Sequence, residues 1–322
     1  MDIKVEKIKE LNEKFDNCRG NRIAQNAAMT NGVAQAATNK KIEGIERHSF
    51  SINLNQGEIT NQKQSGRCWM FAALNSFRYR IIKDLNLKNF ELSQSYPLFY
   101  DKLEKSNYFF NSILKTLDED LDGRLLAHLL SDPLGDGGQW DMFVNLVDKY
   151  GVVPKDVMPE SANSESTRFM DEYLTKLLRT YASKLRASHE NGASMEELEK
   201  MVEGYMEDVH RALCVSLGTP PEVFDFEVRD KDDKFIGEQN ITPQDFFKKY
   251  VKQDLNEYIS IINAPTKDKP YNETYTVDFL GNVVEGKDVK YINLPIEELK
   301  HAAIEQLKAG EPVWFGCDVG QF

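Results

Sequence analysis

The apolar residues of the chain predict a largely helical first half. Between Cys68 and about Leu85 they form one helical stripe, at positions 70, 71, 74, 77, 81, 82 and 85, which is wide enough for a buried helix. A second helix is predicted to begin near Leu92-Ser93, where Ser93 can serve as the N-terminal cap. A third is predicted from Met142 to Tyr150, with Gly151 closing it.

The second half predicts charged helices followed by short strands. Residues 166–217 have the pattern of two amphipathic helices that are separated at Asn191-Gly192 and ended by Thr219-Pro220-Pro221. Two strands and one further helix are predicted after them, at 275–280, 312–317 and 295–308. Residues 1–60 combine a short helical start with a polar arm, which we expect to lie on the protein surface or on a partner subunit.

Composition narrows the classes of function. With 40 basic and 52 acidic residues the net charge is −12, which disfavours binding to nucleic acid or to an anionic membrane. No apolar run reaches the length of a membrane span, and the N-terminus lacks a secretory signal, so we expect a cytoplasmic protein. The cysteines lie far apart and form no CxxC pair, so we expect reduced thiols and neither a metal nor a cofactor.

Cys68 is the strongest candidate for chemistry. It follows Gly66 at the start of the predicted helix, and a helix N-terminus favours the thiolate form, which is the nucleophile. Gln62 lies six residues upstream and can reach back beside the Cys68 main-chain N–H, so the pair can form an oxyanion hole. Gln64 lies at the wrong offset. The alternative is that Cys68 is only a small buried apolar residue, but this does not account for its position after Gly66, before a helix and six residues after Gln62.

A general base is harder to find among the five histidines. In one class of cysteine hydrolases the histidine base lies roughly 130–150 residues after the cysteine, which points to His210, but that residue sits in a charged helical pattern. His301 is followed by two alanines, but its surroundings are helical rather than strand-like. His48, His128 and His189 have no supporting neighbours. We therefore predict that the base is not in this sequence.

An ordered series of motifs runs from about residue 50 to the end of the chain. These are 61–69 (NQKQSGRCW), 92–96 (LSQSY), 135–140 (GDGGQW), 150–154 (YGVVP), 219–221 (TPP) and 311–320 (EPVWFGCDVG). In this order the motifs resemble one family of enzymes, the aminopeptidase C and bleomycin hydrolase branch of the papain-like cysteine peptidases.

The resemblance implies an α+β papain-like fold that carries a helical insertion. It also implies an aminopeptidase that acts on peptide substrates, with Cys68 as nucleophile, Gln62 in the oxyanion hole and the Gly137-Gly138 backbone along the substrate groove. Relatives assemble as hexamers, so a homo-oligomer is expected. Secreted relatives have a cysteine at the position of Ser65, and the loss of that disulfide suits a reducing compartment.

The family's catalytic histidine, followed by alanine on a strand, and its asparagine in an Asn-Ser-Trp run do not appear in this sequence. We therefore expect a chain truncated within the β-rich half of the fold and inactive alone. The expected parts are an N-terminal arm (1–60), the helical half with the nucleophile (61–160), a helical insertion and connection (161–272) and the incomplete β-rich half (273–322). The alternatives are a non-catalytic interaction protein with the same fold and a thiol acyltransferase such as a transglutaminase, which needs the same missing base.

Overall fold

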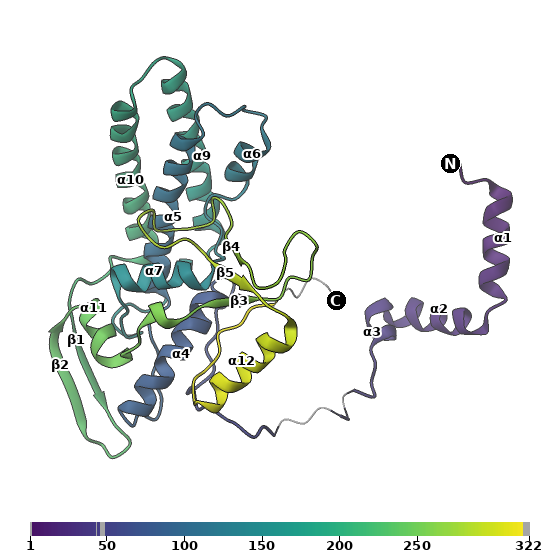
Figure 1. Cartoon of the computed structure of the whole chain (residues 1–322), viewed down its shortest axis with the longest axis horizontal. Coiled ribbons are helices and arrows are strands. Elements are labelled where there is room, and N and C mark those ends of the chain that lie inside the picture. The colour runs from purple at the N-terminus through teal and green to yellow at the C-terminus, as the bar shows by residue number, and fades with distance from the viewer. Residues whose placement is uncertain (1, 43, 46–48, 318–322) are drawn as a thin grey trace. The chain divides into compact units, whose positions relative to one another are not determined.

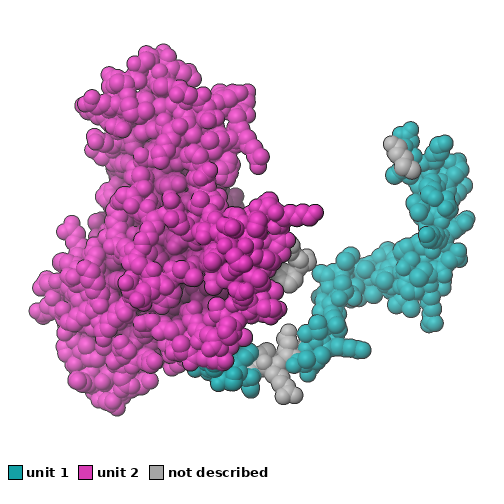
Figure 2. All heavy atoms as spheres, in the orientation of Figure 1, with its two compact units in different colours: residues 1–53 teal, residues 54–322 magenta. Residues whose placement is uncertain are grey.

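The computed structural model describes residues 2–42, 44–45 and 49–317. The chain divides into two compact units, residues 1–53 and residues 54–322 (Figure 2). The limits at residues 60, 160 and 272 that the sequence suggested for its parts stay predictions.

The first unit is more helical than the sequence predicted. Its helices are α1 (Val5–Asp16), α2 (Arg19–Asn31) and α3 (Val33–Ala37). The helical start thus extends well into the predicted polar arm, because its alanines are strong helix formers and the Thr30 hydroxyl and Asn31 amide bond back to the preceding turn. None of the three helices has a buried residue, so tertiary packing within the unit contributes little to them.

The core of the second unit forms around three helices, α4 (Cys68–Asp84), α5 (Ser95–Lys115) and α7 (Trp140–Tyr150), shown in Figure 1. The stripe predicted for α4 is confirmed, since ten of its residues are buried. Phe77 at its centre is fully buried, and its ring lies 5.5 Å from those of Phe143 and Phe247. The Ser93 hydroxyl accepts a hydrogen bond from the Tyr96 N–H at the start of α5, as a cap would.

A long helical hairpin forms from α9 (Arg168–Glu190) and α10 (Met195–Leu217), as predicted, with a break at Asn191-Gly192. Ser194 and Glu197 form a capping box at the start of α10. The rings of Tyr181 and Tyr205 stack 3.8 Å apart between the two helices. The hairpin lies beside α5, with the short helices α6 (Arg124–Ser131) and α8 (Ala162–Glu165) nearby (Figure 1).

The remaining elements form two small sheets with helical connections. An unpredicted antiparallel hairpin consists of β1 (Phe224–Arg229) and β2 (Phe235–Ile241), after which α11 (Pro243–Phe246) continues into a π turn (Phe247–Val251) and a 3-10 turn (Leu255–Glu257) follows. In the second sheet, β5 (Tyr291–Asn293) pairs in parallel with β3 (Ser260–Ile262) and antiparallel with β4 (Thr274–Tyr275). The predicted last helix is confirmed as α12 (Ile296–Lys308).

Two strand predictions are wrong. The strand predicted over 275–280 is reduced to Tyr275 at the end of β4, and residues 312–317 form no strand. A strand must pair its backbone with a neighbour, and no strand in the described part of the chain runs beside residues 312–317. This segment is held by a side chain instead: the Trp314 indole N–H donates to the Trp69 carbonyl oxygen at 3.0 Å. Residues 318–320 of the last sequence motif lie outside the described residues.

Candidate active site

Cys68 is the first residue of α4, and its side chain is exposed. The next two residues, Trp69 and Met70, are buried, so the apolar face of the helix fixes the axis while the thiol stays at the surface. No side chain caps this N-terminus. The first amides of a helix have no partner within it, and here they remain available to an anion beside the thiol.

The two candidate amide side chains upstream differ in their surroundings. Gln64 is engaged, because its N–H donates to the Glu165 carbonyl oxygen at 2.9 Å and its side-chain oxygen lies 3.4 Å from the Ser166 hydroxyl. Gln62 is half-buried, and among the described residues its side chain has no hydrogen-bond partner. This favours Gln62 over Gln64 as a donor to substrate, and the oxyanion role of Gln62 stays a prediction.

Arg67 fixes one side of the cysteine turn, a role that sequence reasoning missed. Its side chain is fully buried, and its guanidinium donates to both carboxylate oxygens of Glu160, at 3.0 and 2.9 Å. Its Nε–H donates to the Ser65 hydroxyl at 2.9 Å, and the Ser164 hydroxyl donates to Glu160. We call these four residues the Arg67 anchor. The sequence offered one indication of this role, because a charged residue, Arg67, directly precedes a helix that was predicted to be buried.

Asp136 fixes the other side of the turn that carries Cys68. Its carboxylate accepts hydrogen bonds from the Gly66 N–H at 2.7 Å and from the Thr167 hydroxyl at 2.6 Å. Its main-chain oxygen accepts from the Trp69 indole N–H at 2.7 Å. Because Gly66 and Trp69 flank Cys68, one residue of the 132–139 loop holds the chain on both sides of the thiol.

The carboxylate of Asp136 is held by a fully buried lysine of α5. The Lys102 ammonium lies 2.7 Å from Asp136 and 2.8 Å from Asp171, and it donates to the Leu134 carbonyl oxygen at 2.7 Å. Burial opposes the charge of Lys102, but Asp171 and Asp136 outweigh it and raise its pKa. We call Lys102, Asp136, Asp171 and Thr167 the Lys102 anchor.

The two carboxylates of this anchor differ in their protonation. Burial, followed by smaller effects of the Asp136 carboxylate, raises the pKa of Asp171 to about 6 against the opposing charge of Lys102. Burial also disfavours ionisation of Asp136, but Lys102, Thr167 and the Gly66 N–H together hold its pKa well below the usual range. The Lys102 ammonium thus pairs with two carboxyl groups, and Asp136 is the stronger acid of the two.

The two glycines that follow Asp136 have different environments. A Cβ atom on Gly138 would lie 2.5 Å from the Trp69 ring, so the absence of a side chain there permits close packing. A Cβ atom on Gly137 would meet nothing within 4 Å. The Lys105 ammonium fixes this loop by donating to the Gly135 and Gly137 carbonyl oxygens at 2.7 Å each. The space beside the Gly137 Cα is thus open although its carbonyl oxygen is bonded to Lys105, and substrate binding by Gly137 and Gly138 stays a prediction.

The described histidines lie on other elements, and none of them bonds to Cys68. They are His128 on α6, His189 on α9, His210 on α10 and His301 on α12. His189 pairs with Asp118 at 3.1 Å, and His210 lies 3.7 Å from the Cys214 sulfur. His48 lies outside the described residues. No described histidine is therefore placed to accept a proton from the Cys68 thiol.

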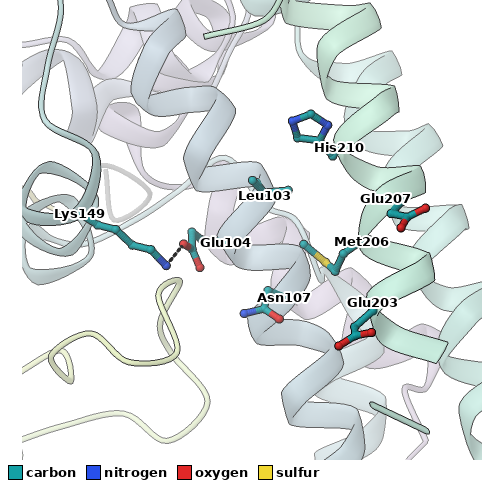
Figure 3. A pocket seen from close by; sticks show the side chains of 8 residues that line it. All are labelled: Leu103, Glu104, Asn107, Lys149, Glu203, Met206, Glu207 and His210. Carbon is teal, nitrogen blue, oxygen red and sulfur yellow. Dashed lines mark hydrogen bonds and ion pairs between the residues drawn. The ribbon is translucent and has the colours of Figure 1, made fainter. Parts of the chain in front are cut away.

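His210 lines a separate cavity of about 450 Å³ between α5, α7 and α10. Figure 3 shows Glu203, Met206 and Glu207 of α10 along one side and the Lys149–Glu104 pair on the other. Cys68 does not line it. In residues 2–42, 44–45 and 49–317, no group of three or more histidine, cysteine or acidic side chains is arranged to hold a metal ion. The same residues contain no helix long and apolar enough to cross a bilayer.

Curated proteins with similar sequences are aminopeptidases and hydrolases. Aminopeptidase C of Streptococcus thermophilus is 50% identical over 297 residues, which cover 92% of this chain and 67% of that protein. Bleomycin hydrolase of Mus musculus is 40% identical over 322 residues, covering 98% of this chain and 71% of that protein. The chain thus spans about two thirds of the length of the Streptococcus protein.

A solved structure and a family model agree with these relatives. The crystal structure of PepW from Lactobacillus rhamnosis superposes with a TM-score of 0.97 at 47% sequence identity, covering 99% of this chain and 72% of that one. The mixed helical and sheet architecture is accordingly the α+β papain-like fold that the sequence predicted. The model of the Peptidase C1-like family matches residues 2–322. The chain belongs to the Peptidase C1-like family.

Proposed function

We propose that this chain carries the nucleophile and oxyanion hole of a cysteine-type aminopeptidase that removes N-terminal residues from peptides. The observation that supports this most directly is an exposed cysteine at an uncapped helix N-terminus, Cys68, held by two buried ionic anchors. Relatives named aminopeptidase C, 43–50% identical, supply the substrate class. A cytoplasmic location and assembly into a homo-oligomer, a hexamer in the full-length protein, are parts of the same proposal.

The proposed reaction is acyl transfer to a thiolate. The Cys68 sulfur attacks the carbonyl carbon of a peptide bond, and the resulting oxyanion is stabilised by the Cys68 N–H and the Gln62 amide. The C–N bond breaks as the leaving amine takes a proton from an acid. Water then attacks the thioester, which releases the acyl group and restores the thiol. The open space beside Gly137 suits the close approach of a peptide main chain.

We propose further that the general base and its orienting asparagine are not supplied by residues 1–322. The supporting observation is that His128, His189, His210 and His301 lie on other elements without a bond to Cys68. An isolated thiol at pH 7 has no partner to receive its proton or to protonate the leaving amine. This chain by itself is therefore expected to be inactive.

Aminoacyl fluorogenic substrates test both parts of the proposal. The purified chain and its Cys68→Ser variant are expected to show the same background rate. Turnover that disappears in Cys68→Ser would refute the missing base but support the peptidase. Covalent labelling of Cys68 by a peptidyl electrophile tests the nucleophile separately, and labelling no faster than at the exposed Cys18 would contradict it.

A non-catalytic interaction protein with this fold is the second candidate, favoured by the absence of any described histidine beside Cys68. The coding sequence beyond codon 322 separates the two. A downstream His-Ala strand and Asn-Ser-Trp run would favour the peptidase, and a stop codon would favour the interaction protein.

A further inference from the structure

Asp136 is bonded to both sides of the turn that carries Cys68. Its carboxylate accepts from the Gly66 N–H and its main-chain oxygen accepts from the Trp69 indole, each at 2.7 Å. A shift of Asp136 would therefore move the chain before the thiol and the first turn of α4 together. Asp136 also directly precedes Gly137, so it connects the turn that carries Cys68 to the backbone that is proposed to bind the substrate.

The carboxylate of Asp136 is in turn held by the first turn of α9. Thr167, which directly precedes this helix, donates its hydroxyl hydrogen to the Asp136 carboxylate at 2.6 Å, and Asp171 lies 2.8 Å from the same Lys102 ammonium that pairs with Asp136. Residues four apart lie on one face of a helix, so Thr167 and Asp171 reach the cluster together. The helical hairpin α9–α10 is thereby joined to the cysteine turn through buried polar contacts.

We propose that Asp136 is a positioning residue for Cys68, and that the α9–α10 hairpin sets the position of the nucleophile through Lys102 and Asp136. This rests on the proposed role of Cys68 as the nucleophile. The effect of a helix N-terminus on a thiolate is confined to the first turn. Misplacement of a reacting group by about 1 Å can cost about a hundredfold in rate, so this geometry has to be fixed.

A purely structural role for Asp136 is the competing explanation, and Glu104 provides a matched control. Glu104 is also a buried carboxylate, lies on the same helix as Lys102, and pairs with Lys149 and the Tyr150 hydroxyl. It makes no bond to residues 66–69. Loss of either carboxylate should lower stability, but only loss of Asp136 should change the chemistry of Cys68.

The test is the pH profile of Cys68 alkylation by iodoacetamide in the chain and in its Asp136→Asn variant, with peptide mass spectrometry to follow each cysteine. Asparagine has one accepting atom, so it cannot serve both the Gly66 N–H and Lys102. We expect Cys68 alkylation at pH 7 to slow about fivefold relative to Cys18, the factor for one ordinary hydrogen bond. Cys18 lies in the first unit and serves as the internal reference.

Two further variants keep the test decisive. Glu104→Gln should lower the unfolding midpoint and leave the Cys68 profile unchanged. Thr167→Val removes one hydrogen bond to Asp136 without disturbing Lys102, so it should also slow Cys68 alkylation, but by a smaller factor. This variant keeps the proposal testable if Asp136→Asn fails to fold.

The outcomes separate the inference from the proposed function. Profiles of Asp136→Asn and Thr167→Val that superpose on that of the parent would overturn the positioning role and leave Cys68 as nucleophile. An equal shift in Glu104→Gln would overturn it too, since general loosening would then explain the change. If Cys68 and Cys18 react alike in the parent chain, the proposed nucleophile fails and the inference fails with it.

Discussion

The Arg67 anchor and the Lys102 anchor both hold the turn that carries Cys68, but they differ in the number of charges that they bring together. In the Arg67 anchor one guanidinium meets one carboxylate, Glu160, in two parallel hydrogen bonds. In the Lys102 anchor one ammonium lies between two carboxylates, Asp136 and Asp171. The first is neutral as a pair, whereas the second carries an excess negative charge when both acids are ionised.

Because of this difference in charge, we expect the two sides of the cysteine turn to behave differently. A planar guanidinium fixes its partner in orientation as well as distance, so the Arg67 side should be rigid. The Lys102 side holds a carboxyl, Asp171, whose pKa is raised to about 6. That side should respond to mild acid, and it is also the side that is joined to the helical hairpin.

The largest effect is expected from Lys102→Met, which leaves two buried carboxylates without their cation. Removing one partner of a buried ion pair costs about 3–5 kcal/mol of unfolding free energy. Urea unfolding of the variant should show this loss. Lys300→Met is the control, because Lys300 and its partner Glu297 both have exposed side chains, at 57% and 80%, so this change should cost at most about 1 kcal/mol. Equal losses would show that the burial of Lys102 has no special weight.

Arg67→Lys tests the other anchor and should cost somewhat less. Lysine keeps the charge but cannot make the paired contacts to Glu160 or the bond to Ser65. We expect a loss of about 2–3 kcal/mol, from one charge-assisted and one neutral hydrogen bond. Urea unfolding of the variant measures this loss. A loss below about 1 kcal/mol would show that the paired contacts of Arg67 contribute little to stability.

A smaller effect is expected from the two glycines of the Asp136 loop, which form a matched pair. Gly138→Ala would place a Cβ atom 2.5 Å from the Trp69 ring, and such overpacking costs about 1–3 kcal/mol. Gly137→Ala meets nothing within 4 Å and should change stability by less than about 0.5 kcal/mol. Thermal unfolding of both variants measures this contrast. A larger loss for Gly137→Ala than for Gly138→Ala would reverse the assignment of the open and packed positions.

The helices could be predicted from the sequence because their hydrogen bonds are local. The apolar stripe after Cys68 and the break at Asn191-Gly192 both correspond to helix limits within a few residues. The segment 312–317 has equally strong strand character but forms no strand, because a strand needs a partner that the local sequence cannot specify. Local patterns thus located the helix that begins at Cys68 and misplaced the strands.

The anchors could not be predicted for the same reason. Gly66 and Asp136 are 70 residues apart and Arg67 and Glu160 are 93 apart, and no spacing rule joins them. One signal was present: the α5 segment carries Lys102 and Lys105 among large apolar residues on all sides, so some of its charges had to be buried. Their partners become apparent only when α5, the 132–139 loop and α9 are brought together.

The pH dependence of the unfolding free energy should reveal the titration of the Lys102 anchor. The pKa of Asp171 is raised in the folded chain to about 6, above its ordinary value near 3.8, so between these values the folded state binds more protons than the unfolded state. Its contribution to stability is then complete below about pH 4 and is lost as pH rises through about 6. Asp136 adds no slope there, because its lowered pKa makes its own contribution constant above about pH 4.

Asp171→Asn removes this titration while keeping the size of the side chain. The variant should therefore gain stability relative to the parent as pH rises from 4.5 to 7, with no further change at higher pH. Other carboxyls with raised pKa values, Asp141 and Asp148, contribute equally to both proteins and cancel in the difference. Lys102 and Asp136 face Asp171 in both proteins, and both keep their charge throughout this range. A difference in unfolding free energy that stays constant from pH 4.5 to 7 would show that Asp171 is ionised throughout and would contradict its raised pKa.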